Sequence, residues 1–190
     1  EIRLVMDRNI NEQLTLGATA LYSEEEIDYD GFNHEFDHID RTRSAGSIYA
    51  SFDSGSITNK IKRSFSNTDR YDRNGWNKSF IGSRDVWNYT GQTIFNGANV
   101  TFGYEESTEE ADIDGQIKDY KETAVISEVN YALGKNSDIS LAARRTSSKN
   151  YGDDTTYRLA AINRHQDELT SRLVLSSGFR APSLYELLDN

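Results

Sequence analysis

Apolar and polar residues alternate with a period of two along most of this 190-residue chain. Such alternation is typical of β-strands whose two faces meet different surroundings. Ile2, Leu4 and Met6 take every second position, and after a polar turn the pattern resumes at Leu14. The alternation predicts about ten strands, around residues 2–6, 14–22, 48–52, 57–65, 87–95, 100–104, 125–133, 139–143, 157–161 and 169–175. The chain is therefore predicted to be all-β.

The connections between these strands are predicted to alternate in length. Short turns are expected near residues 8–12, 54–56, 96–97, 134–137 and 165–168. Among them, Asn96-Gly97 favours a two-residue type I′ hairpin, because both positions tolerate positive φ. Longer polar segments are expected near residues 25–40, 70–83, 109–119 and 148–154. Outer-membrane barrels have this asymmetry, with short turns on one side and longer loops on the other.

The composition agrees with a barrel in a membrane better than with a compact two-layer fold. Hydrophobic residues make up only 36% of the chain, and a transmembrane barrel needs apolar residues only on its lipid face. The longest apolar run, Leu159–Ile162, is far shorter than the roughly 20 residues of a membrane-spanning helix. Glu1 is not followed by a basic and then apolar leader, so any secretory signal is expected outside this sequence.

Aromatic residues gather near the predicted strand ends, where a barrel would carry its interfacial girdles. They are Tyr22, Tyr71, Trp76, Phe80 and Trp87. Tyrosine and tryptophan also favour strands in general, which explains part of this distribution.

Charge narrows the possible partners. The formal net charge is −10 and the sequence pI is about 4.8, which excludes the basic footprint of a nucleic-acid-binding protein. The chain has no cysteine, which excludes disulfides and thiolate metal sites. Arg144, Arg158 and Arg172 take the phase opposite to the apolar residues and are predicted to face a polar lumen.

The stretch Gly178–Leu187, "GFRAPSLYEL", directly follows the last predicted strand and contains the only proline of the chain. Proline is excluded from strand interiors, so Pro182 is expected where a strand gives way to a loop. The stretch resembles the FRAP box of TonB-dependent outer-membrane receptors, through Phe179, Arg180, Ala181, Pro182, Leu184, Tyr185 and Glu186. The preceding residues 122–162 look like the hairpins before that box in vitamin B12-type receptors.

This resemblance implies that residues 1–190 are a partial barrel domain, a section of a 22-stranded antiparallel barrel closed by a separate plug domain. Such receptors lie in the outer membrane of Gram-negative bacteria, among its lipid and lipopolysaccharide. They bind a large, scarce nutrient and import it with energy from the TonB complex, which contacts the plug. They catalyse no covalent reaction and require no cofactor. The chain lacks the plug and more than half of the strands, so it is expected to be a fragment.

The resemblance leaves the nutrient open. Hairpin-level similarity favours cobalamin, with a ferric siderophore close behind. Haem ranks third, because haem receptors are expected to offer an axial histidine, and the segment after Pro182 where one would lie is cut off.

The segment His34–His38, "HEFDH", matches the H-E-x-x-H pattern of zinc hydrolases. That chemistry needs both histidines on one face of a helix, with the glutamate as general base. The acid-rich flanks carry no helical apolar stripe, so a zinc site is not expected.

Aspartates cluster around the same segment, namely Asp28, Asp30, Asp37 and Asp40. Clustered carboxylates suit a hard cation such as Ca²⁺, and receptors of the B12 type bind calcium in extracellular loops similar to this one. A solvated acidic loop explains the same pattern. Calcium is therefore a possible ligand here, and the spacing does not match an EF-hand.

Other acidic runs, at residues 24–26, 105–106 and 109–110, are expected at or above the membrane surface. They would keep the loops soluble, or meet the divalent ions that bridge lipopolysaccharide.

Two other classes of protein fit parts of the pattern. One is a complete ten-stranded outer-membrane barrel with an enzyme site at His34, Asp37 and His38. The other is a soluble all-β, calcium-dependent binding module, in which the apolar faces would pack against each other.

Overall fold

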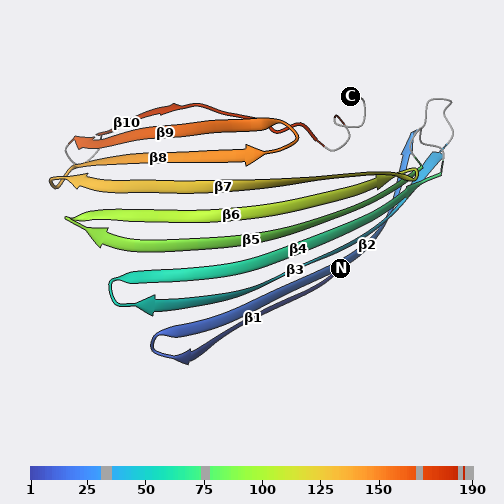
Figure 1. Ribbon diagram of the computed structural model, residues 1–190, viewed down its shortest axis with the longest axis horizontal. Coiled ribbons are helices and arrows are strands. Elements are labelled where there is room, and N and C mark those ends of the chain that lie inside the picture. The colour runs from blue at the N-terminus through green and yellow to red at the C-terminus, as the bar shows by residue number, and fades with distance from the viewer. Residues whose placement is uncertain (31–35, 74–77, 166–168, 184–185, 187–190) are drawn as a thin grey trace.

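The computed structural model describes residues 1–30, 36–73, 78–165, 169–183 and 186. The ten strands form one antiparallel sheet in which each strand pairs with its neighbours in sequence (Figure 1). They are β1 (Ile2–Asn11), β2 (Leu14–Asp30), β3 (Phe36–Ser54), β4 (Ile57–Asp72), β5 (Ser79–Phe95), β6 (Ala98–Ile113), β7 (Gln116–Leu133), β8 (Ser137–Ser148), β9 (Gly152–His165) and β10 (Leu169–Ser176). The predicted all-β fold of about ten strands is confirmed.

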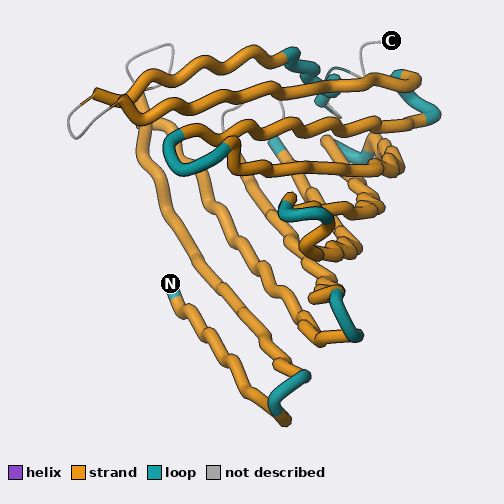
Figure 2. The backbone as a smooth tube through the Cα atoms, turned by 90° about the vertical axis from the view of Figure 1, so that its left-hand side faces the viewer, coloured by secondary structure: helices purple, strands orange, loops and turns teal. Residues whose placement is uncertain are grey.

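The sheet is a single curved layer (Figure 2). Nothing among the described residues packs over either face as a second layer, and the buried apolar residues are few: Ala111, Ile113, Tyr120, Ala124 and Ala160. No helix in the described part of the chain is long and apolar enough to cross a membrane. The arrangement contradicts the soluble module, which requires two apolar faces packed against each other.

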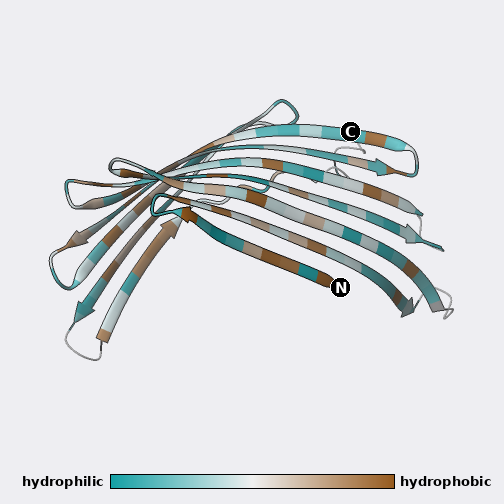
Figure 3. Cartoon of the chain, turned by 90° about the horizontal axis from the view of Figure 1, so that it is seen from below, coloured by the Kyte–Doolittle hydropathy of each residue, from teal (hydrophilic) through white to brown (hydrophobic). Residues whose placement is uncertain are grey.

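The register divides the side chains into two faces with different chemistry. Residues directly opposite each other share a face, so the pairs Leu16–Ala50, Ala50–Ile61 and Ile61–Tyr89 lie on one side of β2 to β5. We call this the outer face and the opposite one the inner face. Apolar and polar residues alternate along the strands as a result (Figure 3).

The outer face carries an apolar band beside the short turns. In β7 this band runs from Val125 to Leu133, which is about the nine to eleven residues that a tilted transmembrane strand needs. Five strands end the band with an exposed aromatic residue: Tyr22, Phe65, Trp87, Tyr104 and Tyr157. An apolar band edged by aromatic residues is typical of the outer surface of a membrane barrel.

The strands continue far beyond the aromatic edge, and here the predicted long loops were wrong. β6 and β7 are paired as far as Ile113–Gln116, and Asp114-Gly115 makes a tight turn with both φ angles positive (51° and 86°). This is a second hairpin turn of the Asn/Asp-Gly type. The prediction failed because both faces are polar beyond the band, so the alternation disappears while the strand pairing continues.

Three of the tight turns predicted on the other side of the sheet are confirmed, near residues 54–56, 96–97 and 134–137. The turn expected at 8–12 is shifted, because β1 continues to Asn11 and the turn is Glu12-Gln13. Asn96-Gly97 has both φ angles positive, and Gly55 and Gly134 are also in the left-handed region. The turn expected at 165–168 lies largely outside the described residues.

The expected aromatic girdle is confirmed only for Tyr22 and Trp87. Tyr71 lies on the outer face but well beyond the band, and Phe80 lies on the inner face, 5.8 Å from the Arg70 guanidinium. Trp76 is outside the described residues. Arg144, Arg158 and Arg172 lie on the inner face, as predicted.

The sheet does not close on itself. Within the described residues β1 pairs only with β2, and β10 only with β9. A ten-stranded barrel made by this chain alone is therefore not what the structure shows.

Candidate functional site

The inner face beyond the band carries a network of paired charges. Arg144 on β8 lies between two glutamates, with its Nη2 atom 2.8 Å from Glu105 on β6 and 3.5 Å from Glu122 on β7. These positions meet because all three residues occupy the inner-face phase of strands that lie within two ladder steps of each other. The network gives this wall both signs of charge.

A second ion pair adjoins this network, where Arg84 Nε lies 3.0 Å from Glu109 Oε1. Between the two pairs lies Tyr120, which is buried. Burial, reinforced by the charge of Glu109, raises the pKa of Tyr120 well above its usual range. Tyr120 therefore remains a neutral hydrogen-bonding group at any physiological pH.

An aromatic ladder extends from this network to the segment after β10. The Tyr120 and Tyr151 rings meet edge to face with centroids 6.2 Å apart, and the Tyr151 and Phe179 rings are 5.6 Å apart. The Tyr151 hydroxyl donates a hydrogen bond to Glu122. Burial and this hydrogen bond raise the pKa of Tyr151 to about 12. The ladder connects β7, the β8–β9 connection and the segment after β10 that contains the FRAP box, which we call the FRAP segment.

A further inner-face cluster lies on β2 and β3. Arg41 donates a hydrogen bond to Glu25, and Arg43 lies 3.8 Å from the same carboxylate. The hydrogen bond from Arg41 lowers the pKa of Glu25. Nearby, the Tyr29 hydroxyl donates to Asp72 at 2.8 Å, which raises the pKa of Tyr29 to about 12.

Beyond the band, the two faces differ sharply in charge. The inner face carries seven acidic and six basic residues on the strands: Glu25, Asp37, Asp72, Glu105, Glu109, Glu122 and Asp154 against Arg41, Arg43, Arg70, Arg84, Lys118 and Arg144. The outer face carries eleven acidic and two basic residues: Glu24, Glu26, Asp28, Asp30, Asp40, Asp69, Glu106, Glu110, Asp112, Asp119 and Asp153 against Lys121 and Arg145. The negative charge of the chain is thus concentrated on the outer face.

The FRAP segment lies after β10, and Pro182 is outside any strand, as predicted. Arg180 pairs with Glu186 at 2.7 Å. Ser183 and Glu186 hold each other reciprocally: the Glu186 carboxylate accepts from the Ser183 N–H at 2.7 Å, and the Ser183 hydroxyl accepts from the Glu186 N–H at 3.3 Å. This is a capping box, a motif that the sequence analysis missed.

The other residues of the predicted motif are placed as follows. Ala181 follows Arg180 in the same strand-free segment, and Phe179 belongs to the aromatic ladder. Leu184 and Tyr185 lie outside the described residues.

The four aspartates of the expected calcium loop lie in strands. Asp28 and Asp30 belong to the outer face of β2, and Asp40 belongs to the outer face of β3. Asp37 lies on the inner face, because it is an odd number of residues from Asp40 in the same strand. Only part of the expected set therefore shares a surface, and a calcium site made of all four stays a prediction that the register does not favour.

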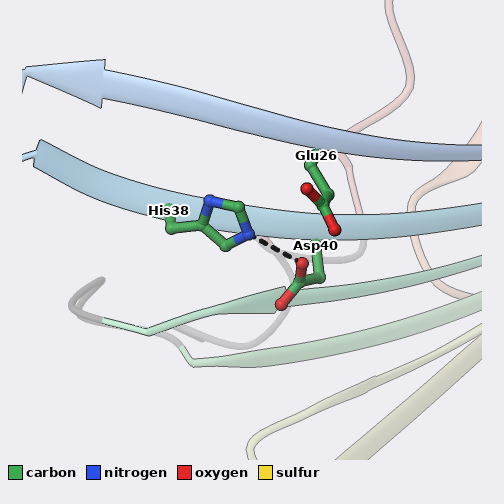
Figure 4. Close-up of side chains that lie close together, drawn as sticks. All are labelled: Glu26, His38 and Asp40. Carbon is green, nitrogen blue, oxygen red and sulfur yellow. Dashed lines mark hydrogen bonds and ion pairs between the residues drawn. The ribbon is translucent and has the colours of Figure 1, made fainter.

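The outer face of β2 and β3 brings together a different group, Glu26, His38 and Asp40 (Figure 4). One ligand atom from each lies within 4.8 Å of the others. His38 Nε2 is 2.9 Å from Asp40 Oδ1, and His38 Nδ1 is 2.8 Å from Asp28 Oδ1. The hydrogen bonds to Asp28 and then to Asp40 raise the pKa of His38.

The described part of the H-E-x-x-H motif does not have the geometry of a zinc hydrolase. His38 lies in extended β3, whereas the motif needs a helix to put both histidines on one face. His34 and its neighbouring glutamate lie outside the described residues.

Sequence reasoning missed most of the inner-wall network. Arg84, Glu122 and Tyr151 were not singled out, and Glu105 and Glu109 were identified only as parts of acidic runs. Arg84, Glu105, Glu109 and Glu122 take the strand phase opposite to the apolar residues. That phase could have identified the four strand residues. Tyr151 lies in a connection, where the period of two gives no information.

Comparison with known proteins identifies the fold. No model of a known protein family and no curated protein matches the chain. Among solved structures, the chain is similar to the siderophore receptor PirA from Pseudomonas aeruginosa, with a TM-score of 0.82 and 13% identity over 96% of this chain and 34% of that receptor. It is also similar to the RagAB peptide importer, with a TM-score of 0.61 and 12% identity over 85% of this chain and 29% of that protein.

These likenesses establish the fold. The ten-stranded sheet has the fold of a section of that siderophore receptor, in agreement with the section of a receptor barrel that the FRAP box and the strand pattern predicted. The chain spans about a third of the length of the siderophore receptor that it matches.

Proposed function

We propose that this chain forms part of the barrel wall of a TonB-dependent receptor in the outer membrane of a Gram-negative bacterium. The observation that carries the proposal is the division of the outer face into an apolar band with an aromatic edge and a polar extension beyond it. A barrel wall has to be apolar only where it meets lipid, and its upper part stands in water. The fold likeness to a siderophore receptor supports the same assignment.

The receptor would import a large, scarce nutrient, which we propose to be a ferric siderophore or cobalamin, with haem third. The inner wall supports a large ligand of mixed polarity. It offers aromatic rings at Tyr120, Tyr151 and Phe179 beside paired charges at Arg84 and Arg144. The likeness to a siderophore receptor supports the siderophore among these candidates.

The partners follow from the same proposal. The apolar band would meet membrane lipid, the acidic extension would lie beside lipopolysaccharide, and a plug domain would receive energy from the TonB complex. Import of this kind changes no covalent bond, so we propose no enzymatic activity.

Uptake assays test the proposal directly. The full-length protein is expressed in a Gram-negative host that lacks its own receptors for cobalamin and ferric siderophores, with TonB present or deleted. We expect uptake of one labelled nutrient only when TonB is present. Uptake that is equal in both hosts, or absent for every nutrient offered, would overturn the proposal.

A variant pair connects the activity to this chain. Replacing Tyr151 by Ala removes the centre of the aromatic ladder and is expected to reduce uptake. Replacing Tyr71 by Ala removes a comparable ring from the outer face and is expected to leave uptake unchanged.

A further inference from the structure

We propose that Glu26, His38 and Asp40 form a binding site for a divalent transition-metal ion on the outer face of the β2–β3 hairpin. The site lies on the face opposite the proposed ligand-facing wall, so it is separate from the import route. It holds β2 and β3 together beyond the membrane. The closest chemical class is Zn²⁺ or a related ion that accepts both imidazole nitrogen and carboxylate oxygen.

The strand register builds the site. Glu26 is directly opposite Asp40, and Asp28 is directly opposite His38, so the four side chains form two adjacent rows on one face. Residues opposite each other in a ladder have Cβ atoms about 5 Å apart, which is the reach of a shared metal ion. The three proposed ligand groups indeed lie within 4.8 Å of one another (Figure 4).

His38 is already oriented as metal-binding histidines are. Its Nδ1 atom is hydrogen-bonded to Asp28, and its Nε2 atom points toward Asp40. Histidine ligands usually donate one ring N–H to a carboxylate, which fixes the tautomer and turns the other nitrogen toward the metal. Asp28 has this supporting role here, and a metal ion would take the place of the hydrogen bond between Nε2 and Asp40.

The Glu26 carboxylate is exposed and free to bind an ion. It makes no hydrogen bond or ion pair with any described residue, although it lies beside an imidazole and a second carboxylate. Asp40 has one basic neighbour, since Arg73 Nη2 lies 3.6 Å away, but that side chain is 62% exposed and can turn into solvent. The outer face around the site is strongly acidic, so local charge attracts a dication.

The donor set favours a transition metal over calcium. Ca²⁺ takes six to eight oxygen ligands, whereas this group offers one nitrogen and two carboxylates. Three protein ligands with water completing the shell are sufficient for Zn²⁺.

Zinc titration of the full-length protein in detergent tests the proposal. We expect one zinc ion per chain. Glu26→Gln and Asp40→Asn each remove a proposed ligand, so each should lower the zinc affinity by at least the roughly 10- to 100-fold that is typical of losing a supporting group. Asp28→Asn is expected to weaken binding within that same range. Glu110→Gln removes an equal charge from the outer face of β6 and is expected to leave zinc binding unchanged.

Glu26→Gln tests whether zinc binds at this site or elsewhere on the acidic outer face. Glu26 is exposed and has no partner among the described residues, so its replacement is expected to preserve folding, which circular dichroism in detergent checks. It is also outside the H-E-x-x-H segment. If Glu26→Gln binds zinc as tightly as Glu110→Gln does, the proposal is wrong.

Two further readouts identify the ligands. Bound Co²⁺ is expected to show visible absorption bands that disappear in His38→Gln and persist in His165→Gln. Calcium in excess is expected to leave bound zinc in place. Displacement of zinc by an equal concentration of calcium would overturn the transition-metal assignment.

Discussion

Arg63 and Asp85 form an ion pair on the outer face of the sheet, with Arg63 Nη2 2.8 Å from the Asp85 carboxylate, at the edge of an otherwise apolar band. The same guanidinium lies 5.4 Å from the centre of the Trp87 ring, which is directly opposite Arg63 in the ladder. Two charges and an aromatic face thus satisfy one another at the edge of the band, which in the proposed barrel is the level at which lipid tails give way to headgroups. The pair was not anticipated from the sequence, since its positions belong to the apolar phase.

Replacing Asp85 by Asn leaves Arg63 facing lipid without a counter-ion. A charged residue on the lipid face is unfavourable by about 2–4 kcal/mol at mid-membrane and by about 0–1 kcal/mol at the interface. Because the pair lies at the edge of the band, we expect the free energy of unfolding to fall by about 1 kcal/mol. Urea unfolding of the full-length protein in lipid vesicles measures this free energy.

The double variant Arg63→Leu/Asp85→Leu is the control for this prediction. It removes both charges, and replacing a whole ion pair by apolar residues is often neutral or stabilising. We therefore expect it to be at least as stable as the parent protein. If the double variant unfolds more easily than Asp85→Asn alone, the two residues do not act as a pair within the lipid boundary.

The band could be predicted from the sequence, and the upper part of the sheet could not. Residues such as Leu16, Ile48 and Val129 alternate with polar neighbours, as in a barrel strand with lipid on one face and a polar lumen on the other. Beyond Tyr104 both faces are polar, so β6 loses its alternation, and its last five residues, 109–113, were expected in a longer polar segment. Strand pairing there is maintained by backbone hydrogen bonds, which leave no hydrophobic pattern to find.

In the candidate sites, too, some features could be predicted from the sequence and others could not. Arg144 was placed on the inner face correctly, because its neighbours in β8 have a clear phase. The grouping of Glu26 with Asp40 depends on the register between two strands, which the residues of either strand alone do not determine. The aromatic ladder depends on Tyr151 in a connection and on the path of the chain after β10, and neither follows from periodicity.

Ser107 and Ser47 are both buried on the inner face, and comparing them tests how a hydrogen bond to a buried hydroxyl affects stability. The Ser107 hydroxyl is buried, with the residue only 1% exposed, and has no hydrogen-bond partner in the described part of the chain. The Ser47 hydroxyl is bonded to Thr19 at 2.9 Å. A net hydrogen bond contributes about 0.5–1.5 kcal/mol, and a buried unpartnered group is unfavourable. We expect Ser47→Ala to lower the free energy of unfolding by about 1 kcal/mol and Ser107→Ala to leave it unchanged or raise it. Equal losses in both variants would contradict this assignment.

Acid is expected to weaken the upper part of the β2–β3 hairpin through Glu25. The hydrogen bond from Arg41 lowers the pKa of Glu25 below its ordinary value of 4.5. A lowered pKa means that the stabilisation is present above pH 4.5 and is lost as pH falls through the folded value. The difference in unfolding free energy between the parent protein and Glu25→Gln should therefore be larger at pH 7 than at pH 3. A difference that grows toward low pH would show that Glu25 and Arg41 are not coupled in the folded state.

The Tyr151 ring is expected to hold the FRAP segment in place through its contact with Phe179. An aromatic pair contributes about 0.5–1.5 kcal/mol, so losing it should raise the opening of the segment about twofold to tenfold. Trypsin reports this opening by cleaving after Arg180, whose side chain is 78% exposed. We expect faster cleavage at Arg180 in Tyr151→Leu and unchanged cleavage in Tyr71→Leu, which removes a ring from the outer face.

Tyr151→Phe separates the two contacts of this side chain. It keeps the ring against Phe179 and Tyr120 but removes the hydrogen bond that the hydroxyl donates to Glu122. If ring packing holds the segment, Tyr151→Phe should be cleaved at the rate of the parent protein. Cleavage as fast as in Tyr151→Leu would instead assign the restraint to the hydrogen bond with Glu122, because the ring contacts are present in one variant and absent in the other.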